Sequence, residues 1–271
     1  MKKISILGCG WLGKALATAL LKKGYAVNGS TRSEEKSIVL KAVGITPYLI
    51  QVENSGIVGD FESFALGADV LITAFPPGLR KNSNANYTAR LKHILTSITS
   101  HPNCNLLHLS SIGVFGAMQG KVDETTRPKP ESEVGKQLLE VEESIMSLRA
   151  NTAIVRLAGL VGDGRHPVKQ LAGKAGISAP LAPTNLVHQT DVITFLTALI
   201  KGGFWGQTFH CVSPLHHQRD TFYTQECKDN GLALPQFSYD KNTRSKKVLD
   251  TKSAKLFGFR YQLAGCHFKD C

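Results

Sequence analysis

The fold is decided by the stretch Lys3–Arg32, which reads KISILGCGWLGKALATALLKKGYAVNGSTR. Its first residues, Lys3–Leu7, form a short apolar run that is typical of a buried strand. The next six residues fit the pattern G-x-G-x-x-G, and the apolar residues behind them repeat with the spacing of one helix face. A second strand begins with Tyr25–Val27. Strand, glycine turn, helix and strand within about 30 residues form the context in which this pattern indicates a dinucleotide site.

The three glycines of the turn each have a physical reason to be glycine. Gly8 allows the tight turn, Gly10 leaves room for a pyrophosphate beside the backbone, and Gly13 lets the helix pack closely on the strand. The N–H groups at the helix start, around Trp11 and Leu12, then bind the pyrophosphate. The alternative is an ordinary strand-to-helix turn, because glycine-rich turns are common.

The end of the second strand indicates which dinucleotide binds. An NAD site needs Asp or Glu there for the ribose 2′-hydroxyl, whereas this chain has no carboxylate before Glu34. Arg32 can hold the 2′-phosphate of NADP with two charge-assisted hydrogen bonds, assisted by the hydroxyls of Ser30 and Thr31. The sequence therefore favours NADP over NAD. The alternative is that Arg32 is a solvent-exposed loop residue with no ligand.

The composition describes a chain that can bury a large core. The 271 residues are 42% hydrophobic, which suits one large α/β domain or a domain with a smaller lobe. No apolar run reaches the ~18–20 residues that span a membrane. A strand begins at the third residue, so no secretory signal is expected before it. We therefore expect a cytoplasmic protein that is not a membrane protein.

The charge raises nucleic acid as a partner, because the formal net charge is +11 and the pI is about 9.4. The basic residues are spread along the chain, however, and the one tight cluster is Arg244–Lys247. No zinc-finger or aromatic-and-basic RNA motif occurs. Attraction of a phosphorylated cofactor or substrate explains the sign of the charge as well. We expect a small-molecule substrate and no specific nucleic-acid complex.

The six cysteines include no C-x-x-C pair. In a chain without a secretory signal this predicts reduced thiols. Cys9 lies inside the glycine turn, and we interpret it as a small filler rather than a reactive thiol. The histidines show no metal-binding spacing, and no metal site is expected.

Strand and helix patterns continue to alternate after Arg32. We expect helices over 34–43, 60–66, 87–98 and 131–148, and strands over 46–50, 68–74, 106–111 and 153–157. The alternation predicts an α/β fold, a Rossmann doubly wound parallel sheet with helices on both faces. The strand over 68–74 ends in a proline-rich turn, where Ala74, Phe75 and Pro76 are expected to contact the cofactor.

The regular pattern loosens at about residue 162, where Gly, Pro and His become frequent. We therefore predict that residues 1–161 form the NAD(P)-binding domain. Residues 162–271 are predicted to form a smaller C-terminal substrate lobe built on the same sheet. We expect a monomer or a homodimer.

Four later segments carry a second signal. Leu109–Gly116 reads LSSIGVFG and is similar to S-S-x-x-V-Y-G, and Arg156–Pro167 is similar to R-L/P-x-x-x-Y-G-P-G. Asn185–Val192 is similar to N-x-x-H-x-x-D-V, and Lys247–Gly258 to K-x-V-x-x-x-K/R-x-x-x-L-G. In this order, the segments resemble the extended short-chain dehydrogenases/reductases, which include nucleotide-sugar epimerases and dehydratases. The resemblance covers nearly the whole chain and implies a sugar or nucleotide-sugar-like substrate.

The resemblance also implies a catalytic set of Ser, Tyr and Lys. Ser111 matches the serine, and Lys136 matches the lysine that binds the cofactor ribose and lowers the pKa of the tyrosine. The tyrosine position holds Ser132, and a serine hydroxyl cannot replace a phenol without another base. Asn86 matches the helix asparagine that organises a water molecule, and Ser110 is expected beside the cofactor.

Two functions are consistent with the missing tyrosine. The chain is an atypical NADP-dependent oxidoreductase, epimerase or dehydratase, or it senses NAD(P) without catalysis. Single residues have simpler interpretations too. Ser111 can be a strand-end serine, Lys136 a solvent-exposed helix lysine, and Asn86 an ordinary helix-start residue. Tyr87 is a further alternative, as a phenol that approaches from another direction.

Overall fold

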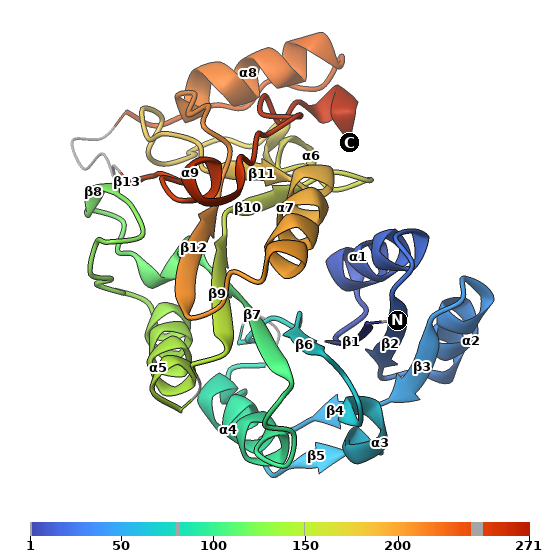
Figure 1. Cartoon of the computed structure of the whole chain (residues 1–271). Helices are drawn as coiled ribbons and strands as arrows, with labels where there is room; N and C mark the ends of the chain where they lie inside the picture. The colour runs from blue at the N-terminus through green and yellow to red at the C-terminus, as the bar shows by residue number, and fades with distance from the viewer. Residues whose placement is uncertain (1, 80–81, 149, 240–245) are drawn as a thin grey trace. The chain divides into compact units, whose positions relative to one another are not determined.

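A computed structural model of the protein describes residues 2–79, 82–148, 150–239 and 246–271 (Figure 1). Part of the basic cluster predicted at Arg244–Lys247 therefore lies outside the described residues. The architecture is α/β, with a seven-stranded sheet in the order β12-β9-β7-β6-β1-β2-β3. The chain starts at β1 and winds outward from it in both directions. This is the doubly wound Rossmann arrangement that the sequence predicts.

The sheet has seven strands, and the first six along the chain begin within about two residues of the predicted runs, the usual uncertainty of element ends. The seven strands are β1 (Lys3–Leu7), β2 (Ala26–Thr31), β3 (Thr46–Leu49), β6 (Val70–Thr73), β7 (Asn105–Ser111), β9 (Thr152–Leu157) and β12 (Gln207–Cys211). Strands β1, β2, β3, β6 and β7 pair in parallel. Ile6 pairs with both Gly29 and Ile72, so the carboxyl ends of β1, β2 and β6 meet at one edge.

The chain divides into two compact units whose segments alternate along the sequence. The first unit holds residues 1–110, 132–155 and 203–208, and the second holds 111–131, 156–202 and 209–271. Three of the changes of unit fall inside strands, namely β7, β9 and β12. Residues 111–131 thus join the second unit although they precede position 161 in the sequence. A domain boundary at that position stays a prediction.

The first unit has helices packed on its strands and on one another. They are α1 (Trp11–Lys22), α2 (Glu34–Ala42), α3 (Phe61–Ala65), α4 (Tyr87–Ile98) and α5 (Glu133–Leu148). Helix α1 packs on β1 and β2, α2 on β2 and β3, and α4 on α5. The buried side chains of α1 include Leu12, Leu16 and Leu20, one face of the helix. All four residues of β6 are buried, as in a strand covered on both faces.

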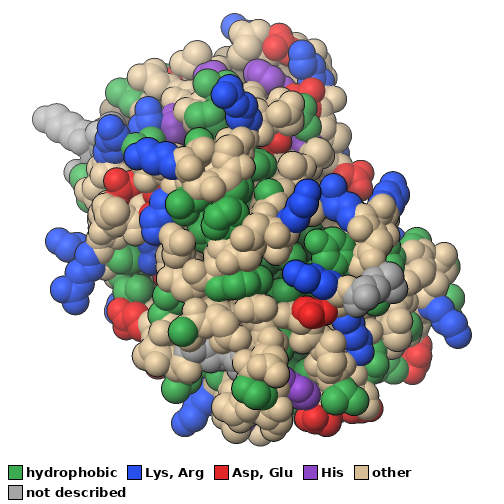
Figure 2. All heavy atoms as spheres, in the orientation of Figure 1, with side chains coloured by type: hydrophobic (Ala, Val, Ile, Leu, Met, Phe, Trp, Pro, Cys, Tyr) green, Lys and Arg blue, Asp and Glu red, His purple; other side chains and the backbone are tan. Residues whose placement is uncertain are grey.

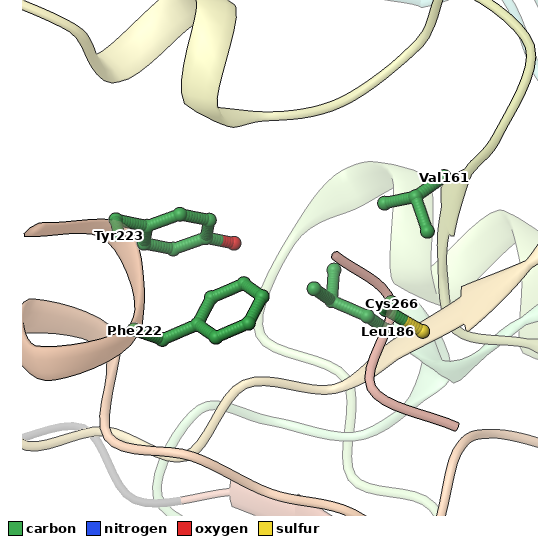
Figure 3. Packing of buried hydrophobic residues seen from close by; sticks show 5 residues of the cluster. All are labelled: Val161, Leu186, Phe222, Tyr223 and Cys266. Atoms are coloured by element: carbon green, nitrogen blue, oxygen red, sulfur yellow. The ribbon is translucent and has the colours of Figure 1, made fainter. Parts of the chain in front are cut away.

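The second unit is built from shorter elements. They are η1 (Ile112–Val114), β8 (Gly120–Val122), β10 (Gly159–Val161), α6 (Val168–Leu171), β11 (Leu186–His188), α7 (Gln189–Gly202), α8 (Arg219–Asp229), β13 (Lys246–Val248), α9 (Ser253–Phe257) and η2 (Phe268–Asp270). One cluster of its core joins Phe222 and Tyr223 of α8 to Val161, Leu186 and Cys266 (Figure 3). The two aromatic rings meet edge to face, 5.2 Å apart.

Residues 262–270, near the C-terminus, are held by four buried side chains that we call the C-terminal clasp: Asp191, Glu226, His166 and His188. The Asp191 carboxylate accepts hydrogen bonds from the backbone N–H groups of residues 262 and 263. Glu226 bonds to His267 Nδ1 at 2.6 Å and accepts from the N–H of residue 268 at 2.7 Å. His166 and His188 donate to backbone carbonyls of residues 266 and 270.

The sequence patterns do not predict three short strand pairs that the structure contains. They are β4 (Gln51–Val52) with β5 (Ile57–Val58), β8 with β13, and β10 with β11. Each strand has only two or three residues, which is too short for a repeating apolar pattern to be seen. The β4–β5 hairpin matters most here, because it forms one wall of the candidate site.

The surface carries many separate charges. On the face in Figure 2, lysine and arginine side chains lie at many points, with acidic and apolar side chains between them. All six cysteines are free thiols. Within the described ranges, no helix has both the length and the apolar character needed to cross a lipid bilayer.

Candidate functional site

A cavity of about 920 Å³ lies in the first unit, at the edge where the carboxyl ends of β1, β2 and β6 meet. Its walls come from five parts of the first unit: the glycine turn, the end of β2 with the start of α2, the β4–β5 hairpin, the turn after β6, and the region around the start of α4. The lining residues are Leu7–Gly10, Ser30–Ser33, Lys36, Ile50–Ser55, Ala74–Pro76, Gly78, Asn82, Ala85 and Arg90.

The glycine turn has the geometry that a dinucleotide pyrophosphate needs. Gly8 has φ +109°, and a Cβ there would lie 3.1 Å from the backbone of Ala74. A Cβ on Gly13 would lie 2.2 Å from the carbonyl oxygen of Gly8, so the helix could not pack this closely with any other residue. A Cβ on Gly10 would meet nothing within 4 Å. The space beside Gly10 is thus open, and the residues present fit the phosphate-binding turn of the fold.

The start of α1 suits an anion. Its N-cap residue is Gly10, which offers no side-chain hydrogen bond, and no acidic residue lies in the first turn. The positive end of the helix dipole is therefore not neutralised by the helix's own side chains. Trp11, Leu12 and Gly13 lie in this first turn, as predicted from the motif.

Ser30, in β2, accepts two hydrogen bonds from the glycine turn. The Ser30 hydroxyl accepts a hydrogen bond from the Gly8 N–H at 2.8 Å, and the Ser30 carbonyl accepts from the Cys9 N–H at 2.9 Å. Ser30 thus holds the turn against β2. Burial raises the pKa of the Cys9 thiol to about 12. This confirms Cys9 as a filler, because the reactive thiolate form is disfavoured.

The mouth of the cavity beside β2 is positively charged. Arg32 and Lys36 both line the cavity and are exposed. The Ser33 hydroxyl accepts from the Lys36 N–H and caps α2, which places Lys36 in the first helical turn. Among the described residues that line the cavity, three are cations, Arg32, Lys36 and Arg90, and one is a carboxylate, Glu53. Sequence reasoning missed Lys36, although its position four residues after Arg32 is a usable signal.

Arg90 enters the cavity wall from α4. Its guanidinium donates hydrogen bonds to the carbonyls of Pro77 and Asn86. It also lies 5.9 Å from the ring centroids of both Phe75 and Tyr87, a distance at which a cation is attracted to an aromatic face. Burial, and to a lesser extent the charge of Arg32, lower the pKa of Arg90. No sequence motif pointed to this residue.

The β4–β5 hairpin is fixed to the start of α4 by one side chain, Asn54. Its amide donates to the Asn84 carbonyl at 2.8 Å and accepts from the Asn86 N–H at 3.0 Å. The backbone carbonyl of Asn54 bonds to His93 Nε2 at 3.0 Å. The wall of the cavity formed by Gln51–Ser55 is thus anchored at its tip.

Two of the predicted catalytic residues of the first unit, Asn86 and Ser132, accept hydrogen bonds from backbone N–H groups three residues later in the chain. Asn86 caps α4 by accepting from the N–H of residue 89 at 2.9 Å. The Ser132 hydroxyl accepts from the N–H of residue 135 at 3.1 Å, just before α5 begins, and Lys136 is exposed on that helix. None of the three is among the described residues that line the cavity. Their catalytic roles stay predictions.

Ser110 and Ser111 end β7 with different partners. Ser110 is buried, and its hydroxyl donates to the carboxylate of Glu142 on α5 at 2.5 Å. Sequence reasoning missed Glu142, a buried acid on an otherwise amphipathic helix. Ser111 belongs to the second unit, where its hydroxyl accepts from the Gly113 N–H at 3.1 Å. The roles predicted for both serines stay predictions.

Tyr87 is unsuited to act as a substitute phenol. Its side chain is 1% exposed, and its hydroxyl donates to the Phe75 carbonyl at 3.4 Å. Burial raises its pKa well above the usual value, so the tyrosinate form is strongly disfavoured.

A buried histidine lies behind the same sheet edge. His108 Nδ1 and the Thr73 hydroxyl are 2.7 Å apart, while His108 Nε2 has no hydrogen-bond partner among the described residues. Burial lowers the pKa of His108 to about 3.

The residues that the structure describes contain no group of three or more His, Cys, Asp or Glu that could hold a metal ion.

Comparisons with known proteins agree with this site. Residues 3–101 match the family model described as NADP oxidoreductase coenzyme F420-dependent. Protein YeeZ of Escherichia coli (strain K12) is 33% identical over 265 residues, which cover 97% of this chain and 96% of that protein. An uncharacterized protein of Schizosaccharomyces pombe is 26% identical over 75% of this chain and 72% of its own length.

Solved structures share the fold. UDP-glucuronic acid 4-epimerase from Bacillus cereus, in complex with NAD, has a TM-score of 0.79 and 16% identity, and covers 99% of this chain and 94% of its own. A functionally unknown conserved protein from Silicibacter pomeroyi DSS has a TM-score of 0.75 and 21% identity, covering 96% and 93%. Together with the open glycine turn, the family-model match identifies residues 3–101 as an oxidoreductase-like, NAD(P)-binding region.

Proposed function

The chain belongs to the family of Escherichia coli Protein YeeZ, and from that premise we propose that it is an NADP-dependent oxidoreductase, epimerase or dehydratase of the extended short-chain dehydrogenase/reductase type. Its substrate is a sugar or nucleotide-sugar-like hydroxyl compound. The single observation that carries the proposal is the cavity beside Gly10, which is open to a pyrophosphate and whose described lining holds three cations and one carboxylate. The free cysteines suit a cytoplasmic location.

Different residues of the cavity would bind different parts of the cofactor. The turn Gly8–Gly10 and the start of α1 bind the pyrophosphate. Arg32 and Lys36 line the cavity beside β2 and would hold the ribose 2′ substituent, where a phosphate favours cations and a hydroxyl favours a carboxylate. Phe75 and Pro76 line the same cavity and would contact the bound cofactor.

The bound nicotinamide supplies hydride transfer. The protein's own task is to place the substrate hydroxyl and to move its proton. Ser111 and Lys136 are the proposed donors for that oxygen and for the ribose. The substrate class is supported by the likeness to structures solved with nucleotide sugars, such as the Bacillus cereus epimerase with UDP-glucuronic acid and NAD.

A second candidate function is supported by α5. The inward face of this helix carries Gly135, Leu138 and Glu142, all buried, whereas Lys136 is exposed. A Tyr–Lys pair that serves a cofactor has to lie on one face, four residues apart. In this chain the residue four positions before Lys136 is Ser132 and not a tyrosine, so this pair is missing. This favours the alternative in which the protein binds NADP as a sensor and performs no redox chemistry.

Two measurements on the full chain test the proposal. Titration calorimetry with NADP⁺ and NAD⁺ is expected to show binding of both, with NADP⁺ at least about tenfold tighter. Binding of neither cofactor would refute both candidate functions. Turnover of a panel of sugars and nucleotide sugars is then measured for the native protein and Lys136→Ala, by NADPH absorbance for net oxidation or reduction and by chromatography of the products for epimerisation or dehydration, which return the hydride to the product. Turnover that Lys136→Ala abolishes supports the enzyme, and tight NADP⁺ binding without turnover supports the sensor.

A further inference from the structure

Arg90 lines the same cavity as Arg32 but comes from a different part of the first unit. Arg32 follows β2, and Arg90 lies in the first turn of α4, more than fifty residues later in the chain. Figure 1 shows β2 and α4 as separate elements. Both are wall residues of one cavity within the first unit. A ligand in this cavity therefore meets a guanidinium from each of two separate elements.

Among the described residues, neither Arg32 nor Arg90 has a carboxylate within ion-pair distance. The guanidinium of Arg90 donates hydrogen bonds to two backbone carbonyls, of Pro77 and Asn86, which carry no formal charge. The charge of Arg32 also lowers the pKa of Arg90, so the two guanidinium groups act on each other. Two like charges facing one cavity are unfavourable unless an anion binds there.

We propose that Arg90 is a second specificity-determining residue for the cofactor and binds the 2′-phosphate of NADP from the α4 side, with Arg32 on the β2 side. This inference rests on the proposed function, because it assumes that a nicotinamide dinucleotide occupies the cavity. A guanidinium has five N–H donors. Arg90 uses two of them on Pro77 and Asn86, which leaves three for phosphate oxygens.

The surroundings of Arg90 hold it in place before a ligand arrives. Its guanidinium lies over the rings of Phe75 and Tyr87 at 5.9 Å. The first turn of α4 is fixed by the Asn86 cap and by Gln137, whose side chain accepts from the Tyr87 N–H at 2.8 Å. A side chain that is already ordered loses little conformational entropy on binding. Arg90 is thus a preorganised partner for a dianionic group.

A competing role for Arg90 is to stack on the adenine ring. Guanidinium groups stack on flat π systems, and adenine is common to NAD and NADP. The two roles give opposite predictions. Binding to the 2′-phosphate affects NADP alone, whereas stacking affects NADP and NAD equally.

Titration calorimetry of the full chain with NADP⁺ and with NAD⁺ separates them. The proteins are wild type, Arg90→Ala, Arg90→Lys and Lys92→Ala. Lys92 is the matched control, because it is an exposed cation on the same helix that does not line the cavity. Arg90→Ala is expected to weaken NADP⁺ about ten- to a hundredfold, the usual effect of losing hydrogen bonds to a charged group. NAD⁺ should change by less than about threefold.

Two further measurements test the same role of Arg90: the NADP⁺ affinity of Arg90→Lys and the preference for NADP⁺ at lower pH. Arg90→Lys should recover part of the NADP⁺ affinity, because it restores the charge without the planar fork. The preference of the wild type for NADP⁺ should shrink below pH ~6, where a phosphate monoester loses its second charge, and the change should be smaller in Arg90→Ala. Equal losses for both cofactors, or no loss for either, would overturn this inference while leaving the proposed function intact. A wild type that binds neither cofactor would overturn the proposed function itself.

Discussion

The charged side chains of the cavity in the first unit and those of the C-terminal clasp in the second unit differ in whether the protein itself supplies their partners. In the clasp, buried Asp191 and Glu226 accept hydrogen bonds from the chain itself. In the cavity, Arg32 and Arg90 have no carboxylate partner among the described residues and face open space. A charge that the protein satisfies is a structural feature, whereas a charge left at a cavity indicates an external partner.

The comparison predicts different losses on mutation. Removing a clasp residue should reduce stability and leave cofactor affinity unchanged. Removing an exposed cavity cation, Arg32 or Lys36, should reduce affinity and leave stability unchanged. The predictions below test this separation.

The largest effect is expected at Glu226. Glu226→Ala leaves the Phe268 N–H and the His267 ring without their partner, in a place where Glu226 is 4% exposed. The free energy of unfolding should fall by about 3 kcal/mol, as measured by urea denaturation. Asp229→Ala, an exposed acid at the end of the same helix, should stay within about 0.5 kcal/mol. A loss of NADP⁺ affinity in folded Glu226→Ala would contradict the separation.

A smaller, pH-dependent effect is expected at His108. Its pKa in the folded protein is about 3, below the ordinary value of 6.5. Below pH 6.5 the unfolded chain therefore binds a proton that the folded chain does not, and stability is lost as the pH falls. By pH 5 this costs about 2 kcal/mol.

Urea denaturation of wild type and His108→Asn at pH 7 and pH 5 measures this effect. The variant keeps a polar partner for Thr73 but does not titrate. It should lose about 2 kcal/mol less than wild type between the two pH values. An identical loss in both proteins would show that His108 does not titrate as its burial requires.

Arg32→Ala is expected to act on affinity alone. The change removes a charge-assisted pair to the 2′-phosphate, so NADP⁺ should bind about tenfold more weakly. NAD⁺ lacks this phosphate, and its affinity should stay within about threefold. The free energy of unfolding should stay within about 0.5 kcal/mol, because Arg32 is exposed. Equal weakening of both cofactors would remove the role assigned to Arg32.

The smallest effect is expected at Lys36. It is an exposed single charge at the cavity mouth, and such charges are strongly screened. Lys36→Ala should weaken NADP⁺ about threefold at ~150 mM salt, and by more at lower salt. Lys41→Ala, at the other end of α2, is the control and should have no effect on calorimetric affinity. A similar loss in both variants would indicate a general charge effect instead of a local contact.

The sequence predicts the fold well where its patterns are long. The strand at Lys3–Leu7 and the helix at Tyr87–Ile98 agree with the structure residue by residue. The apolar spacing of these segments is long enough to identify them. The strands β4 and β5 have two residues each, which is too short for the sequence pattern to predict them. The cavity wall that carries Asn54 is therefore not predicted either.

The catalytic residues Ser132 and Lys136 are predicted from motif spacing alone. The structure shows Leu138, Val141 and Ile145 on the buried face of the same helix and Lys136 exposed, and the roles of Ser132 and Lys136 stay predictions. Arg90, in contrast, could not be found, because only the folded chain brings it to the cavity that Arg32 lines.

The alternation of the two units along the chain has a consequence for proteolysis. Each unit is assembled from three separated segments. No single cleavage of the backbone can therefore release either unit whole, wherever it falls. A protease that nicks one exposed loop should leave fragments that stay together under native conditions and separate only in denaturant. Truncation is accordingly a poor way to isolate the cofactor-binding part of this chain, and point substitutions are the better instrument.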